Sequence, residues 1–173
     1  RTDLVELGYR VTMNLSADFA GIDRPRQDTE ETERLLRLVQ CFSEGATLVH
    51  STRDHEQVRR EVLQALEEFD EAFLVPSRKR RMALIEAFEA GRCAEEKLPR
   101  DVITVLLRNR HKLALTDSIF RREVAFYLQA GSHSTANSLT HAMHRIFGWC
   151  ATRSGARERL EGDLTFLQRC VHE

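Results

Sequence analysis

A single uninterrupted helical pattern, from about Ser118 to Ala151, decides what this chain can fold into. The stretch contains no proline, and at 1.5 Å per residue a helix of this length spans roughly 50 Å. Asp117 or Ser118 can cap its start, because a short polar side chain there accepts a hydrogen bond from the first free amides. We therefore expect a long helix with shorter helices packed around it.

The rest of the chain repeats the helical pattern. Only three prolines occur, Pro25, Pro76 and Pro99, and each is expected to end or separate helices. No two alternating β-branched runs flank a tight turn, so no sheet is predicted. The other expected helices cover residues 3–19, 29–47, 54–74, 76–91, 100–110, 154–163 and 164–173. We predict an all-α fold, with residues 1–173 forming one partial domain.

The first expected helix, residues 3–19, has clear signals at both ends. Asp3 suits its N-cap, and Gly21 suits the left-handed position that follows a helix. Its apolar residues recur at helical spacing: Leu4, Leu7, Val11, Leu15 and Phe19.

Composition excludes several classes of function. The chain has 173 residues, 42% hydrophobic and 31% charged, which is enough for one domain with a core. The formal net charge of −1 gives no sign of a nucleic acid or an anionic membrane as partner. A basic run at 78–81 follows an acidic group at 67–71, and both are expected to lie on solvated helix faces. No apolar run approaches the roughly 20 residues that a membrane span needs.

The chain has four cysteines, Cys41, Cys93, Cys150 and Cys170, and none forms a CxxC pair. Reduced thiols and a cytoplasmic location are therefore expected. The chain opens on Arg1 and stops inside an amphipathic pattern, which predicts a piece of a longer protein. An anchor before Arg1 remains an open alternative.

The centre of the long helix, residues 130–137, is unusually small and polar. Helical spacing places one stripe toward the core: Val124, Leu128, Gly131, Thr135, Leu139, Ala142, Ile146 and Trp149. The opposite side carries Phe126, Ala130, His133, Asn137 and His144, with Ser134 at its flank. Composition alone favours a partly exposed face made of weak helix formers.

The alternative interpretation is a face that meets a flat, bulky group. Ala130 and Gly131 would let another body approach the backbone closely. The hydroxyls of Ser134 and Thr135 can bond to carbonyls four residues back, which loosens and bends a helix. The loosened turn would then hold a small polar ligand such as dioxygen or water.

The order AGSHST, residues 130–135, resembles the motif on the long distal helix of the cytochromes P-450, the haem-thiolate monooxygenases. The family order is alanine or glycine, glycine, any residue, an acid, threonine, then threonine or serine. The final segment, DLTFLQRCVHE, is similar to the start of helix K, whose Glu-x-x-Arg motif would begin at Glu173. The resemblance covers essentially the whole chain, from about helix D or E of the family to the start of helix K.

This resemblance implies the central portion of the cytochrome P-450 fold and, in the parent protein, haem (iron protoporphyrin IX). The family activates O2 at the haem iron and inserts one oxygen atom into a small hydrophobic organic substrate. Electrons would come from a ferredoxin- or flavodoxin-type donor protein, or peroxide would replace them. The implied haem contacts are Ala130, Gly131 and Ser134, the catalytic residues Ser134, His133 and Thr135, the substrate contacts Phe126, Gln129 and Ala130, and the structural residue Glu173.

The chain departs from the family pattern at two positions of the motif. Ser134 keeps the hydroxyl of the usual threonine but loses the methyl group that fixes its rotamer. His133 replaces the acid; it can relay protons near neutral pH but carries no fixed negative charge. An altered oxygen-activation cycle, including one that uses peroxide, is therefore an alternative interpretation.

None of the four cysteines lies in the Phe-x-x-Gly loop that carries the family's haem ligand. This stretch is therefore not expected to hold haem through a thiolate or to turn over substrate alone. His141 and His144 could share a metal, but His133 is too far along the helix to complete a tetrahedral site, so no metal site is predicted. The competing class of function is a non-enzymatic all-α interaction module without a cofactor.

Overall fold

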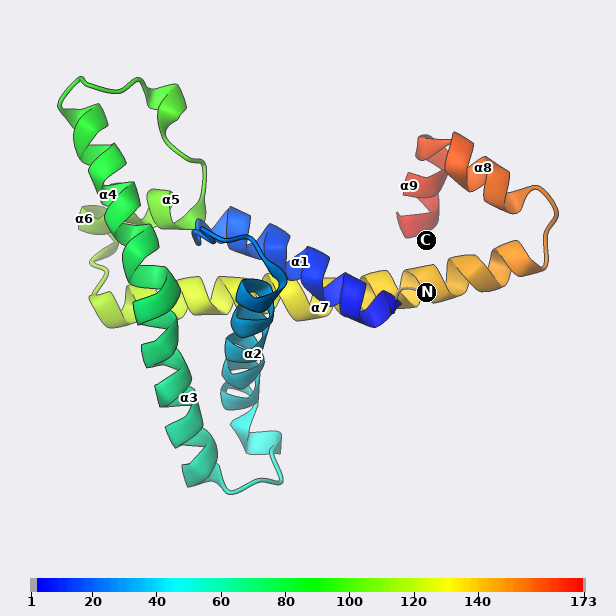
Figure 1. The fold of residues 1–173 in the computed structure, drawn as a ribbon, viewed down its shortest axis with the longest axis horizontal. Coiled ribbons are helices and arrows are strands. Elements are labelled where there is room, and N and C mark those ends of the chain that lie inside the picture. Colours follow the sequence, from blue (N-terminus) through cyan, green and yellow to red (C-terminus); the bar gives the residue numbers. More distant parts are fainter. Residues whose placement is uncertain (1–2, 173) are drawn as a thin grey trace.

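The computed structural model describes residues 3–172, and every regular element in that range is helical. Helix α7, Asp117–Ala151, runs the length of the molecule, and α1, Leu4–Ala20, lies along it (Figure 1). Helices α2, Thr29–Ala46, and α3, His55–Phe69, pack on each other and project to one side, whereas α4, Val75–Glu89, projects to the other. The remaining elements are the short helices η1 (Leu48–His50), η2 (Asp70–Leu74), η3 (Glu95–Lys97), α5 (Val102–Arg108), α6 (Arg110–Leu113), α8 (Ala156–Gly162) and α9 (Leu164–His172). The all-α prediction is confirmed.

Local capping chemistry explains most helix ends. Asp3 accepts hydrogen bonds from the amides of Val5 and Glu6 at 2.8 and 3.2 Å, and Gly21 closes α1 with φ of 87°. The prediction for the start of α7 is wrong by one residue, because Thr116 accepts from the Ile119 amide at 3.2 Å and is the N-cap.

The prediction that Pro76 breaks the third helix is also wrong. The chain passes from α3 through one wide π-helical segment, Asp70–Leu74, directly into α4. Pro76 lies in the first turn of α4, where its missing N–H and fixed φ are tolerated.

Apart from Met13, helix α1 buries its small residues rather than its large ones. Leu7, Val11, Leu15 and Phe19 are 44, 42, 50 and 61% exposed. The buried residues of α1 are Gly8, Thr12, Met13, Ser16, Ala17 and Ala20. Small side chains allow α1 to approach α7 closely, and the apolar stripe that the sequence predicts in this helix faces away from the described core.

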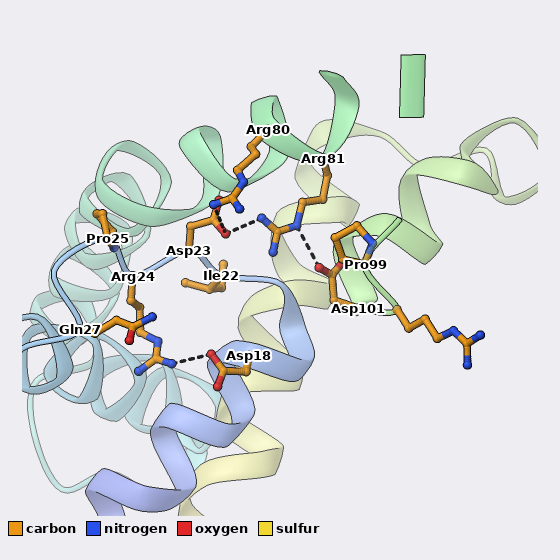
Figure 2. Close-up of a pocket in the computed structure, with 11 residues that line it drawn as sticks. Asp18, Ile22, Asp23, Arg24, Pro25, Gln27, Arg80, Arg81, Pro99 and Asp101 are labelled. Carbon is orange, nitrogen blue, oxygen red and sulfur yellow. Dashed lines mark hydrogen bonds and ion pairs between the residues drawn. The ribbon is translucent and has the colours of Figure 1, made fainter. Parts of the chain in front are cut away.

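A buried ionic cluster joins α4, α5 and the loop after α1. The guanidinium of Arg81 donates to Asp101 Oδ2 at 2.9 Å and to Asp23 Oδ1 (Figure 2). Arg81 is 8% exposed and Asp101 is 5% exposed. The expectation that residues 78–81 form a solvated face is therefore wrong at Arg81, whose partners are distant in sequence.

The acidic group at 67–71 is likewise partly engaged. Glu68 accepts from Arg34 and Arg37, each at 2.7 Å, and Asp70 accepts from Arg121 at 2.8 Å. These pairs attach α3 and η2 to α2 and α7. None of the helices within residues 3–172 is both long and apolar enough to cross a bilayer.

Candidate functional site

The small residues at the centre of α7 lie where α1 crosses it. A Cβ atom placed on Gly131 would lie 2.6 Å from Ser16 Oγ, which is shorter than real contacts of this kind. Thr12 Oγ1 donates to the carbonyl of Ser132 at 3.0 Å across the same crossing. Close packing of α1 on α7 therefore accounts for the glycine at position 131.

The buried stripe of α7 differs from the predicted one. Its inward residues are Phe120, Val124, Ala125, Leu128, Ser132 and Ala136. Thr135, predicted to face the core, is exposed, whereas Ser132 is fully buried. The difference arises because α1 offers small residues at every fourth position, which favours the same spacing on α7.

We expect Gly131→Ala to destabilise the protein by about 1–2 kcal/mol, although alanine is the better helix former by about 1 kcal/mol. The reason is the contact with Ser16 Oγ, which the added methyl group would overlap. Urea unfolding of Gly131→Ala, Ser16→Gly and the double variant measures the coupling between the two positions. In the Ser16→Gly background the alanine should be neutral or stabilising; an equal loss in both backgrounds would contradict the packing explanation.

A second face of the same turns is open. Phe126, Ala130 and Ser134, spaced by four residues, are all exposed, and Phe126 is 65% exposed. We call Phe126, Ala130 and Ser134 the open face. Ser134 Oγ donates to the Ala130 carbonyl at 2.8 Å, as its position in the sequence predicts. The helix nevertheless stays α-helical throughout Asp117–Ala151, so the expected loosened turn is not formed.

His133 lies beside α1 rather than on the open face. Its ring packs edge-on against Tyr9 with centroids 5.4 Å apart, and its Nδ1 lies 3.4 Å from Ser132 Oγ. Tyr9 in turn donates to Asn137 Oδ1 at 3.2 Å. Burial lowers the pKa of the His133 imidazole from its ordinary value of 6.5, so the ring is neutral near pH 7.

The lowered pKa of His133 predicts a pH dependence of stability. The unfolded chain binds a proton at this residue more readily than the folded chain does, so stability falls as the pH drops through 6.5 toward the lower folded pKa. Above 6.5 the effect is absent. Denaturant unfolding at pH 7.5 and 5.5 should show a smaller acid loss for His133→Gln than for the wild type; identical losses would contradict the assignment.

An apolar cavity of about 570 Å³ adjoins the open face, between the end of α2, the start of α3 and α7. Phe126 and Gln129, both predicted as substrate contacts, line it, whereas Ala130 does not. The other lining residues are Phe42, Gly45, Ala46, Leu48, Val58, Arg59, Val62, Leu63, Leu66, Arg122 and Ala125. The sequence did not identify the individual lining residues of α2 and α3, because only the tertiary packing brings these helices to α7.

The open face consists of an aromatic ring, a methyl group and a hydroxyl, and it contains no histidine, cysteine or carboxylate. Its middle residue is alanine, so no side chain larger than a methyl group stands between Phe126 and Ser134. The four cysteines are free and half-buried, and burial raises the pKa of the Cys41 thiol. Within residues 3–172 no three histidine, cysteine or carboxylate side chains gather as a metal site. Glu173, assigned to helix K by resemblance, lies outside the described residues.

No family model, curated protein or solved structure matches this chain. Its functional assignment therefore depends on its own residues and their geometry.

Proposed function

We propose that this chain is the central part of a haem-thiolate monooxygenase acting on a small hydrophobic organic substrate. The observation that carries the proposal is the open face. Ala130 and Ser134, two positions of the family-like motif, are exposed in the middle of the longest helix, as is Phe126, four residues before the motif. The cavity lined by Phe126 and Gln129 lies beside it and gives the substrate a place next to that face.

Haem, when bound, supplies the activation of dioxygen and the transfer of one oxygen atom. Phe126 and Ala130 offer it an apolar surface of low relief. The Ser134 hydroxyl carries the only proton donor of the open face and currently donates it to the Ala130 carbonyl. Turning about its Cα–Cβ bond would direct the same proton outward to a ligand, since serine lacks the methyl group that restricts threonine.

Proton delivery would differ from that of the family pattern. His133 contacts Tyr9 and Ser132 and is neutral near pH 7, so it adds no negative charge beside Ser134. We propose that protons reach Ser134 from solvent directly, because Ser134 is exposed. A peroxide-dependent cycle is compatible with this arrangement, as is electron supply by a ferredoxin- or flavodoxin-type protein.

The test uses the polypeptide encoded by the complete reading frame. We expect it to bind haem and, after reduction and addition of carbon monoxide, to give the red-shifted Soret band of thiolate ligation. Absence of that band, or a natural chain that ends at Glu173, would overturn the proposal.

In that protein, Ser134→Ala is expected to lower product formed per electron consumed by about tenfold or more, with peroxide released instead. The loss follows from removal of the only hydroxyl on the open face. Product yield and peroxide are measured together, and Thr135→Ala, a neighbouring exposed hydroxyl off the open face, is the matched control. Equal effects of the two substitutions would argue against a special role for Ser134.

A non-enzymatic interaction module is the second candidate, favoured by the exposed apolar stripe of α1, Leu7, Val11, Leu15 and Phe19. Such a stripe on a soluble domain marks a surface that packs on another polypeptide. In a module the partner would be a separate protein, whereas in the enzyme it would be another part of the same chain. The reading frame and the carbon monoxide spectrum distinguish the two.

A further inference from the structure

The cavity between α2, α3 and α7 has an uneven distribution of charge. Ten of its residues are apolar or glycine, and the other three are Arg59, Arg122 and Gln129. No carboxylate belongs to its lining. In a chain with 27 acidic and 26 basic residues, a cavity with two guanidinium groups and no acid is electrostatically selective.

The two arginines differ in how far their charge is compensated. Arg59 pairs with Glu56, one turn back on α3 and outside the cavity. Arg122 is exposed at the cavity and makes no ion pair within residues 3–172, whereas its neighbour Arg121 is held by Asp70. Arg122 is therefore the group available to an incoming anion, and its planar guanidinium matches a carboxylate in a two-point contact.

The apolar part of the cavity fits a short hydrocarbon chain. Its volume of about 570 Å³ lies within the range of small-molecule sites, roughly 300–1,000 Å³. The wall formed by α2 and α3 is tight, because a Cβ atom on Gly45 would lie 2.8 Å from a methyl group of Val62. A ligand in this cavity must therefore lie parallel to α2 and α3 and cannot insert between them.

We infer that this cavity binds a monocarboxylate with an unbranched apolar tail, its carboxylate on Arg122 and its tail among the side chains of α2 and α3 toward Phe126. The identification of this ligand as the substrate rests on the proposed function, whereas the binding of the acid is independent of that function. If the ligand is the substrate, the small hydrophobic substrate of the proposed function is restricted to apolar monocarboxylic acids. Gln129, one turn beyond Ala125 on α7, supplies a neutral polar contact to the same cavity.

The test is calorimetric titration of the polypeptide encoded by the complete reading frame, before haem is added, using decanoate, decanol and decylammonium below their micelle concentrations. Decanoate should bind at least fivefold more tightly than decanol, and decylammonium should bind most weakly. Octanoate should bind about tenfold more weakly than decanoate, since each buried methylene group contributes to affinity. Equal binding of the three decyl compounds, or none, would overturn the inference.

Variants locate the site. Arg122→Gln should weaken decanoate about fivefold and leave decanol unchanged within twofold, and Ala46→Trp, at an exposed position of the lining, should weaken both. The matched control is Arg157→Gln, because Arg157 lines a separate apolar cavity between α7, α8 and α9. If Arg157→Gln rather than Arg122→Gln removes the preference for the acid, the ligand lies in that other cavity and the inference fails.

The experiments distinguish failure of the two proposals. If the complete protein binds decanoate selectively but binds no haem, the acid-binding site is supported and the monooxygenase function is contradicted. If it gives a thiolate-type carbon monoxide spectrum but does not bind decanoate selectively, the monooxygenase function is supported and the preference for acids is contradicted.

Discussion

Replacing Asp101 with alanine is expected to lower the free energy of unfolding by about 3–5 kcal/mol, because it leaves a buried cation short of a partner. Asp101 accepts from Arg81 Nε at 2.9 Å, and Arg81 would keep only Asp23. The same carboxylate caps α5 by accepting from the Thr104 amide at 2.7 Å. Loss of the cap adds about 1 kcal/mol to the cost and is included in the range.

Chemical denaturation monitored by circular dichroism measures the effect. The control is Glu161→Ala, which removes an exposed i, i+4 pair with Arg157 and should cost less than about 0.5 kcal/mol. If the double variant Asp101→Leu with Arg81→Met is as unstable as Asp101→Ala, the unpaired charge is not the cause. Recovery of stability in that double variant would support the unpaired charge of Arg81 as the cause of the loss.

Phe69→Ala is expected to cost about 3–5 kcal/mol, since it opens a cavity in the core. Phe69 is fully buried, and its ring contacts Phe42 edge-on at a centroid distance of 5.6 Å and Phe73 at 6.3 Å. It therefore joins α2, α3 and η2 at one point.

Thermal and urea unfolding test this substitution against Phe147→Ala, which removes a ring of the same size that is 58% exposed. The exposed substitution should change stability by less than about 0.5 kcal/mol. A similar loss at both positions would contradict burial as the source of the stabilisation, because alanine is the better helix former at either position.

Helix ends were predictable from the sequence because their causes are local. Asp3 and Gly21 act on amides and carbonyls within a few residues, so short-range rules locate them. The burial of Arg81 was not predictable, because Asp23 and Asp101 lie 58 and 20 residues away. Pro76 was misjudged because a proline in the first turn of a helix and a proline that ends one look alike without the preceding backbone.

In the candidate site, too, features with local causes were predictable and features that depend on tertiary packing were not. The hydrogen bond from Ser134 to Ala130 follows from four-residue spacing and was expected. The role of Gly131 could not be expected, since its neighbour Ser16 lies on another helix. The orientation of α1 also required the structure: hydrophobicity favours burial of Leu7 and Leu15, but the close approach to α7 requires the small residues on the other side.

The wide π-helical turn of η2 determines which side chains of α4 face the core. From Phe69 to Ile85 one row of buried residues falls at every fourth position, Phe69, Phe73, Ser77, Arg81 and Ile85, with Leu74 buried beside it. In a regular α-helix each such step over-rotates by about 40°, so the row would spiral away from the core. The five residues Asp70–Leu74 take up part of that rotation. The segment thus fixes the rotation of α4 about its axis relative to α3. Removing one residue from it would rotate Arg81 by about 100° away from Asp23 and Asp101.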